Sequence, residues 1–404
     1  MPNARIVIAL SAAILILDGL DAQVVGFVAP ALAKELGVGP QAIAPVFSLG
    51  LFGLMLGALL LGPLADRVGR KPVLVGSVLA FGALSALTFF AHSLTALVVL
   101  RFLTGLGLGG AMPNAVALTA EYVSERRRST AVMSIFAGFS LGAAIGGSIA
   151  AHMIPAFGWR SVFLLGGALP LVLAPMLIAW LPESARWQLH RGAPETPRVP
   201  VAGLFASGRT VVTALLWVAF FTNLLALYFC SSWLPTVLVN EGYTLPAAVA
   251  VAALFQYGGV AGALLLGWPA DRYHPSLVIG STLAAGVAFV LLIGHVAAGP
   301  LVPLLVTLMG FCIVGGQNGL NGLAARSYPT ILRSTGVGWS LGIGRIGSIV
   351  GPLIGGALLA NHATIASIFS VIAIPLALCA ASAYGVRRPA GADEPALGAA
   401  AAVS

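Results

Sequence analysis

Twelve long apolar segments decide what this chain can fold into. Each is long enough to cross a bilayer as a helix, which takes about 20 mostly apolar residues. Hydrophobic residues make up 59% of the chain and charged residues only 8%, whereas soluble domains are about one quarter charged. The sequence therefore predicts an all-α integral membrane protein with twelve transmembrane helices. The segments lie near residues 6–30, 45–65, 72–92, 94–120, 130–153, 160–181, 211–239, 246–269, 276–297, 300–325, 335–360 and 363–385.

The basic residues predict how the chain lies in the membrane. If the N-terminus is cytoplasmic, the inner loops and tails hold 16 of the 20 Lys and Arg residues, and the outer loops hold only Lys34 and Arg160. Basic residues accumulate in cytoplasmic loops of membrane proteins, so we expect both termini in the cytoplasm and the protein in the inner (plasma) membrane. The net charge of +8 is then a topology signal, and no nucleic-acid partner is expected. Membrane lipid is the expected environment, and we expect a monomer.

The chain repeats itself at an offset of 205 residues. Asp66 and Arg67 recur as Asp271 and Arg272, and the tripeptide RST that begins at Arg128 recurs at Arg333. Glycine and proline pairs keep the same offset, namely Pro30/Pro235, Gly53/Gly258, Gly57/Gly262, Gly105/Gly310, Gly142/Gly347 and Gly146/Gly351.

This repeat predicts two pseudo-symmetric six-helix bundles. We expect an N-terminal bundle at 1–181, a central cytoplasmic linker at 182–210, a C-terminal bundle at 211–385 and a disordered cytoplasmic tail at 386–404. Two like bundles that face each other across a cavity are typical of transporters that open to one side of the membrane at a time.

The repeat breaks at the charges inside the membrane. Asp18 pairs with an asparagine, Asp21 with an alanine, Arg101 with a valine and Arg345 with a serine. At about 1.5 Å per helical residue, all four charges lie roughly 16–22 Å above the inner face of a ~30 Å core. Charged groups at this depth usually face an internal cavity and mark the path of a substrate or proton. A static ion pair between one aspartate and Arg101 is the alternative, but it does not explain four groups on three helices.

These charges suggest how transport is coupled. Two aspartates and two arginines sum to zero, so a bound carboxylate leaves one excess negative charge, which protonation of Asp18 or Asp21 removes. We expect Arg345 to bind the substrate carboxylate and Arg101 to pair with an aspartate, although the two roles can be exchanged. Further candidate substrate contacts are Asn114, Tyr228, Gln317, Asn318, Asn321 and Trp339.

The stretch GPLADRVGRK, which starts at Gly62, joins the second and third apolar segments. Its acidic and basic residues predict a cytoplasmic latch that is released during transport, whereas a role in topology alone explains only the basic ones. Glu121 and Arg326 occupy equivalent places near the inner face, and predict either a gate between the bundles or salt bridges fixed in every state. The candidate gating residues are Asp66, Arg67, Arg70, Glu121, Asp271, Arg272, Arg326 and Arg333.

These motifs resemble the major facilitator superfamily. GPLADRVGRK resembles its signature GxxxDRxGRK, RFLTGLGLGG from Arg101 its fourth-helix signature, and LPESARW from Leu181 its signature at the end of the sixth helix. DGLD at Asp18 resembles the DGxD pattern of the aromatic acid:proton symporter branch, and the block from Tyr328 to Pro352 is similar to that branch too. The resemblance implies proton-coupled uptake of a small aromatic carboxylate by alternating access.

Other function classes have less support in the sequence. The three cysteines have no CxxC partner, and no metal-ligand cluster, phosphate loop or nucleophile triad is present, so we expect neither an enzyme nor a cofactor, with protons as the coupling ion. Alternatives are proton-coupled transport of a non-aromatic organic acid, an antiporter that exports drugs or acids, and a non-transporting receptor. Two arginines in the cavity argue against cationic drugs.

Overall fold

The computed structural model describes residues 4–189, 201–206, 208–296 and 299–386. In this part of the chain, twelve helices are long and apolar enough to span a bilayer, which confirms the predicted all-α membrane fold. The first six spans are α1 (Ala4–Leu36), α2 (Pro40–Val68), α3 (Arg70–Leu87, extended by the 3-10 turn η1 at Thr88–Phe90), α4 (Leu94–Tyr122), α5 (Glu125–Phe157) and α6 (Arg160–Trp180).

The second set of spans follows the same order. Between the two sets lie the short helix α7 (Ala185–Leu189) and the 3-10 turn η2 (Val201–Leu204), while much of the expected linker and tail lies outside the described residues. The predicted span 246–269 ends early at Leu265 and continues as a separate short helix. The remaining elements are α8 (Thr210–Asn240), α9 (Leu245–Leu265), α10 (Gly267–Arg272), α11 (Pro275–Val296), α12 (Val302–Ser327), α13 (Thr330–Ala360) and α14 (Ile365–Gly385).

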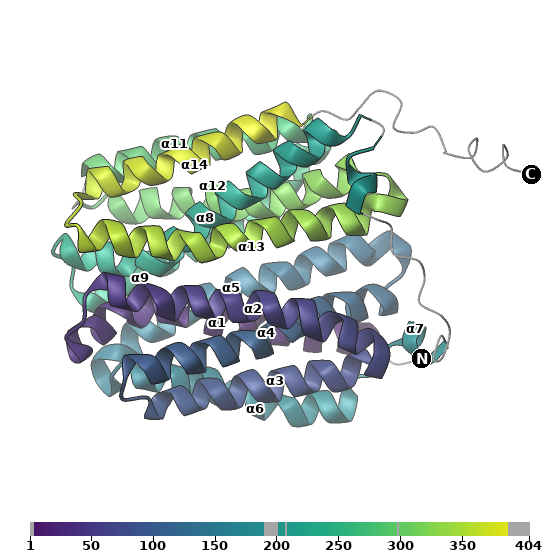
Figure 1. The fold of residues 1–404 in the computed structure, drawn as a ribbon, viewed down its shortest axis with the longest axis horizontal. Coiled ribbons are helices and arrows are strands. Elements are labelled where there is room, and N and C mark those ends of the chain that lie inside the picture. The colour runs from purple at the N-terminus through teal and green to yellow at the C-terminus, as the bar shows by residue number, and fades with distance from the viewer. Residues whose placement is uncertain (1–3, 190–200, 207, 297–298, 387–404) are drawn as a thin grey trace, which may run out of the picture.

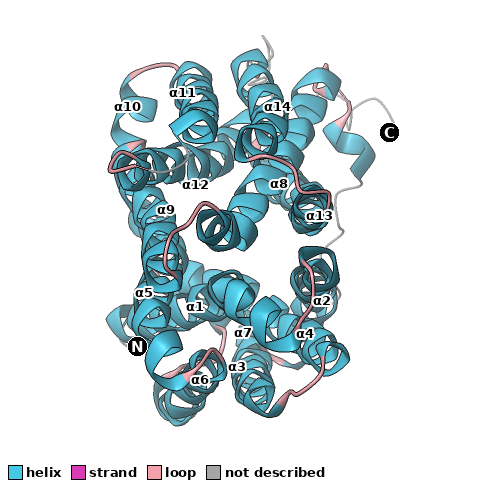
Figure 2. Cartoon of the chain, turned by 90° about the vertical axis from the view of Figure 1, so that its left-hand side faces the viewer, coloured by secondary structure: helices cyan, strands magenta, loops and turns pink. Residues whose placement is uncertain are grey.

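The two halves form two bundles that lie side by side (Figure 1). In the first, α2 packs on α4, α1 on α5 and α3 on α6; in the second, the equivalent pairs are α9 with α12, α8 with α13 and α11 with α14. Viewed end-on, the bundles meet where α5 contacts α9, α2 contacts α13 and α1 contacts α8 (Figure 2). The fold is thus two pseudo-symmetric six-helix bundles.

Glycines at equivalent positions make the close contacts inside each bundle. A Cβ on Gly53 would lie 2.1 Å from the Phe102 carbonyl oxygen, and one on Gly258 would lie 2.0 Å from the Thr307 carbonyl oxygen. The two contacts are equivalent, because the glycine and its partner in the second bundle each lie 205 residues after those in the first. The contact of Gly57 with Leu106 is related to that of Gly262 with Phe311 in the same way. Small residues let helix backbones approach each other, which stabilises packing where lipid tails provide no hydrophobic drive.

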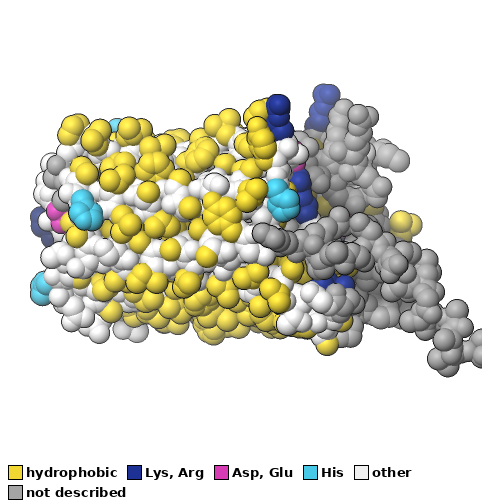
Figure 3. Space-filling model, turned by 90° about the horizontal axis from the view of Figure 1, so that it is seen from above, with side chains coloured by type: hydrophobic (Ala, Val, Ile, Leu, Met, Phe, Trp, Pro, Cys, Tyr) yellow, Lys and Arg dark blue, Asp and Glu magenta, His cyan; other side chains and the backbone are white. Residues whose placement is uncertain are grey.

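The outer surface of the bundles suits a bilayer. Large apolar side chains are exposed along the helices, for example Leu59, Val172 and Leu264, each more than 60% exposed. Figure 3 shows one face covered by hydrophobic side chains, with most of its Lys and Arg side chains gathered toward one end. Because the described residues form twelve spans, α1 begins and α14 ends on the same side of the bundles.

The bundles touch tightly at the end away from the termini. A Cβ on Gly26 of α1 would lie 2.3 Å from the Ser231 carbonyl oxygen of α8, and one on Gly356 of α13 would lie 2.7 Å from the Cβ of Ala44 in α2. Ser48 of α2 donates a 2.8 Å hydrogen bond to the Ile349 carbonyl of α13. These contacts close that face of the molecule.

A side chain at Gly26 should open this closed face. We expect Gly26→Val to force α1 and α8 apart, since overpacking a tight contact costs about 1–3 kcal/mol. A cysteine at Ala44, which is buried at the α2–α13 contact, should then react with an impermeant thiol reagent about fivefold faster or more. Gly76→Val is the control, because a Cβ there meets nothing within 4 Å. An unchanged labelling rate in Gly26→Val would show that this contact does not hold the face closed.

Candidate functional site

The first buried ion pair joins α1 to α4. The Arg101 guanidinium donates a 3.0 Å hydrogen bond to the Asp21 carboxylate, and the two side chains are 4% and 1% exposed. Ser85 of α3 donates to the other Asp21 oxygen. Arg101 also donates to the Thr104 hydroxyl at 3.2 Å and lies 4.9 Å from the centre of the Phe163 ring. Four helices of the first bundle therefore hold this pair in place.

These additional contacts explain why a buried pair is tolerated here. Removing two charges from water is expensive, and mutual attraction offsets this cost only when hydrogen bonds satisfy the remaining atoms. Asp21 accepts from both Ser85 and Arg101, and the Phe163 ring interacts favourably with the cation, whose Nε alone has no hydrogen-bond partner among the described residues. The pair has the character of a fixed structural unit, which was the alternative considered for one aspartate.

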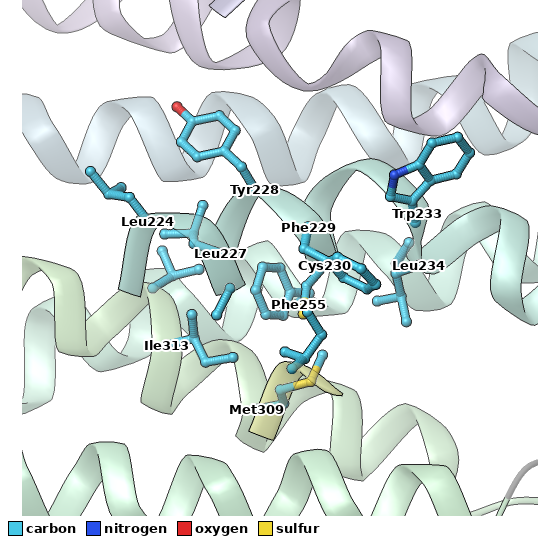
Figure 4. Close-up of a cluster of buried hydrophobic side chains, with 14 of the residues drawn as sticks. Leu224, Leu227, Tyr228, Phe229, Cys230, Trp233, Leu234, Phe255, Met309 and Ile313 are labelled. Carbon is cyan, nitrogen blue, oxygen red and sulfur yellow. The ribbon is translucent and has the colours of Figure 1, made fainter. Parts of the chain in front are cut away.

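The second pair of charges spans the two bundles and is looser. Asp18 of α1 is 1% exposed, and its Oδ1 has no hydrogen-bond partner among the described residues. Arg345 of α13 acts on it electrostatically without forming a salt bridge within 4.0 Å. Arg345 is partly buried and donates a 3.2 Å hydrogen bond to the Tyr228 hydroxyl. In Figure 4 the Tyr228 hydroxyl points away from the hydrophobic cluster around Phe229.

A cavity lies between the bundles beside the first pair. Asp18 and Arg345 do not line it, whereas Tyr228, to which Arg345 donates, does. The space of the cavity, including the part that is open to solvent, is about 480 Å³. Polar groups are few, and apolar side chains from α1, α2 and α4 form most of the wall. The polar lining residues are Asp21, Gln23, Arg101, Thr104, Tyr228 and Ser232, and the apolar ones include Val25, Val46, Phe47, Leu51, Leu54 and Leu108.

Several predicted substrate contacts lie elsewhere. Asn114 donates 2.7 Å to the carbonyl of Gly110 in its own helix, and Asn318 likewise donates 3.2 Å to Val314. Asn114 is 13 residues from Arg101, about 20 Å along α4. These two amides satisfy their own helices and are not part of the cavity wall.

An amide network occupies the interior of the second bundle. The buried Asn223 amide donates 2.9 Å to Gln317, which contacts Asn321 at 3.4 Å. Trp339 is 43% exposed and stacks on Trp217, with ring centres 6.0 Å apart. The sequence predicted three of these residues as substrate contacts, namely Gln317, Asn321 and Trp339, and none of them lines the cavity in this conformation.

The geometry of the GPLADRVGRK stretch depends on a residue that the sequence analysis missed. The Glu183 carboxylate accepts from the backbone nitrogens of Arg70 and Lys71 at 2.8 and 3.1 Å, so it caps the N-terminus of α3. Gly69 has φ 109°, and a Cβ there would lie 2.5 Å from Glu183. Asp66 is 64% exposed and forms a 3.7 Å ion pair with Arg70.

The gating candidates pair within their own bundles. Arg70 donates to Glu121 at 2.5 Å, and Ser184 donates to the same carboxylate at 2.7 Å. In the second bundle, Arg326 forms an ion pair with Asp271.

The remaining gating candidates lie on the surface at the same end. The Arg67 carbonyl accepts from the Trp187 indole, Arg272 lies over the Trp268 ring, and Arg333 is exposed. In this conformation the described ion pairs brace single bundles, and a latch between the bundles stays a prediction.

Polar residues inside apolar segments were the signal for the other missed residues. Ser85, Gln23 and Ser232 lie in runs of apolar residues where an unpaired polar group is costly. Glu183 lies inside the quoted stretch LPESARW, where an acid next to a helix end is available for capping.

Breaking the Arg101–Asp21 pair should cost stability in a recognisable pattern. We expect Arg101→Met to lower the free energy of unfolding by about 3–5 kcal/mol, because Asp21 keeps a buried charge without its cation. Adding Asp21→Asn should recover part of this loss, since the charge is then absent. Thermal unfolding in detergent of both single variants and the double variant measures the coupling. Strictly additive losses would mean that the two groups do not stabilise each other.

Comparison with known proteins places the chain in a family. A family model described as Major Facilitator Superfamily matches residues 12–346. The 4-hydroxybenzoate transporter PcaK of Pseudomonas putida is 44% identical over 396 residues, covering 90% of this chain and 88% of that protein. A gallate transporter of Pseudomonas putida is 40% identical over 390 residues, covering 90% of this chain and 87% of that protein.

Solved structures agree with this assignment at the level of the fold. The crystal structure of a D-xylose-proton symporter superposes with a TM-score of 0.77 at 15% identity, over 95% of this chain and 98% of that one. The family and these relatives are transporters, which confirms the prediction that the chain is not an enzyme. The chain belongs to the Major Facilitator Superfamily.

Proposed function

We propose that this protein imports a small aromatic carboxylate together with a proton. The observation that carries the proposal is the arrangement of Asp18 and Arg345. They come from different bundles, and Asp18 has a buried oxygen without a hydrogen-bond partner among the described residues. The names of the relatives support an aromatic acid as the substrate class, and the largely apolar cavity suits an aromatic ring.

The charges suggest which residues carry the proton and the substrate. Arg101 and Asp21 neutralise each other inside the first bundle, so Asp18 and Arg345 remain as the responsive pair. A guanidinium binds a carboxylate through two parallel hydrogen bonds, and Arg345 is partly exposed. Once a substrate carboxylate occupies Arg345, an ionised Asp18 is an excess negative charge.

This excess charge is the source of coupling. A net charge at this depth costs at least about 3 kcal/mol, so binding of the anion favours protonation of Asp18. Because coupling between two binding events is reciprocal, a protonated Asp18 favours binding of the anion equally. One proton carried with one monoanion moves no net charge, so the proton gradient alone drives uptake.

The closed face of the structure suggests its place in the transport cycle. With both termini in the cytoplasm, as the basic residues favour, the contact of α1 with α8 at Gly26 closes the cavity to the outside. The structure then corresponds to the state from which substrate leaves toward the cytoplasm. Rocking of the bundles separates Gly26 from Ser231 and exposes the site to the outside. We place the protein in the inner membrane as a monomer that needs no cofactor besides the coupling proton.

Uptake into proteoliposomes with an imposed pH gradient tests this function. We expect an inward proton gradient to drive accumulation of 4-hydroxybenzoate or benzoate, and not of a short aliphatic acid of the same charge. Accumulation of the aliphatic acid instead would identify a general organic acid carrier. Efflux of the aromatic acid that is driven by an inward proton gradient would identify an antiporter. If no acid moved in either direction, transport of carboxylates would be contradicted.

Replacing Asp18 should separate transport from its driving force. We expect Asp18→Asn to abolish accumulation driven by a pH gradient, because the asparagine has no proton to exchange. Exchange of labelled for unlabelled substrate should persist and lose its pH dependence. Asp21→Asn should instead impair stability, since Asp21 is held by Arg101 and Ser85. Normal pH-driven accumulation in Asp18→Asn would remove Asp18 from the coupling role.

Changes at Arg345 should act on substrate affinity. We expect Arg345→Lys to raise the apparent KM about tenfold, because lysine keeps the charge but cannot bind a carboxylate through two parallel hydrogen bonds. Arg345→Met should raise it further. Concentration-dependent uptake and binding measured by thermal shift provide the two readouts. Unchanged apparent affinity in both variants would exchange the roles of Arg345 and Arg101.

A further inference from the structure

We propose that Gln23 and Ser232 form a polar subsite that recognises a hydroxyl group on the aromatic ring of the substrate. This inference rests on the proposed function and concerns the end of the molecule opposite the carboxylate. It predicts that hydroxylated aromatic monocarboxylates are preferred over unsubstituted ones.

Both residues line the cavity, and Gln23 has hydrogen-bonding capacity to spare. Gln23 of α1 and Ser232 of α8 are each 4% exposed. The Gln23 amide nitrogen has no partner in the part of the chain that the structure describes. The Ser232 hydroxyl lies on the same wall, whereas its neighbour Ser231 accepts a hydrogen bond from Gln256 at 3.1 Å.

An unpaired amide at this position has an energetic consequence. Leaving a buried donor without a partner costs about 1–3 kcal/mol. The amide nitrogens of Gln256 and Asn223 avoid this cost, because they donate to Ser231 and Gln317, although the Asn223 oxygen has no partner among the described residues. Gln23 differs because it lies on the wall of the cavity, where a ligand oxygen can supply the missing partner.

The spacing of the site fits one aromatic ring. Arg345 donates to the Tyr228 hydroxyl, which places the carboxylate end beside Tyr228. Ser232 follows Tyr228 by four residues, about one helical turn or 5–6 Å, which is comparable to the length of a ring with a substituent opposite its carboxylate. Val25, Leu51 and Leu54 line the space between and provide apolar contact for the ring.

The closed face limits how far the ring extends. A Cβ on Gly26 would lie 2.3 Å from the Ser231 carbonyl oxygen, so α1 and α8 meet directly next to Ser232 and about one turn along α1 from Gln23. A ring substituent that enters this part of the cavity lies near these two polar side chains, which both line it. A site built to hydrogen-bond a hydroxyl discriminates strongly against the analogue that lacks it, because the polar groups of the protein are then left unpaired.

Transport of two acids that differ by one hydroxyl tests the subsite. We expect wild-type protein in proteoliposomes to show a higher kcat/KM for 4-hydroxybenzoate than for benzoate. Gln23→Met keeps the approximate side-chain length but removes the amide, and should lower the ratio of the two kcat/KM values about tenfold or more. Ser232→Ala should lower the ratio in the same direction. Ligand-induced shifts in melting temperature with both acids provide a second readout that does not require transport.

The control is a buried polar residue away from the cavity. Thr236 of α8 is 8% exposed and, among the described residues, its hydroxyl is unpartnered, but it does not line the cavity. Thr236→Val should therefore leave the ratio unchanged.

The outcomes separate this inference from the proposed function. Equal loss of both acids in Gln23→Met, or an unchanged ratio in both variants, would overturn the subsite while leaving aromatic acid transport intact. Wild-type protein that neither binds nor transports either acid would overturn the proposed function and the subsite together. If Gln23→Met does not fold, the melting-temperature shifts of Ser232→Ala decide the question alone.

Discussion

Direct contact between helix backbones is the constraint on which this structure depends. Lipid tails are as apolar as the helix surfaces, so burial of apolar surface does little to drive helices together, and close packing has to do it. Glycines supply that packing here, and they do so twice, at positions 205 residues apart such as Gly53 and Gly258. The two bundles are similar in structure because glycines at equivalent positions make the same close helix contacts in each.

The charges are distributed unequally between these bundles. The Arg101–Asp21 pair lies wholly within the first bundle and is held by Ser85, Thr104 and Phe163. Asp18 and Arg345 instead belong to different bundles, and the Arg345 charge acts on Asp18 electrostatically. A pair fixed within one rigid unit cannot respond to relative movement of the bundles, whereas a pair divided between them can. The sequence difference between the halves therefore decides which charge pair changes when the bundles move, in addition to where the charges lie.

Position along a helix could be predicted from the sequence, but direction around it could not. Helix ends and the depth of Asp18, Asp21 and Arg101 follow from apolar length and a constant rise per residue. The facing direction of a membrane helix leaves little trace in its apolar pattern, because both lipid and protein interior accept apolar residues. Asn114 was placed in the cavity on depth and polarity, yet it satisfies the carbonyl of Gly110 in its own helix.

Tertiary partners were equally hard to predict. The cap of α3 comes from Glu183, more than 100 residues away, and not from Asp66 near the C-terminal end of α2. Gln23 was overlooked because a single amide in an apolar run gives no indication of whether it has a partner. The repeat, in contrast, was visible because it depends on many matched positions and on no single contact.

Among the described residues, the seam between the bundles contains no salt bridge. The ion pairs found between described residues all lie within one bundle, and the seam consists of glycine packing, the Phe47–Trp233 edge contact, and hydrogen bonds from Ser48 and Ser148. Parting the bundles along this seam breaks none of these ion pairs, and the Asp18 and Arg345 charges that it moves apart are not in salt-bridge contact. The balance between the two orientations of the molecule should therefore depend little on ionic strength, and more on the lateral pressure and thickness of the surrounding bilayer.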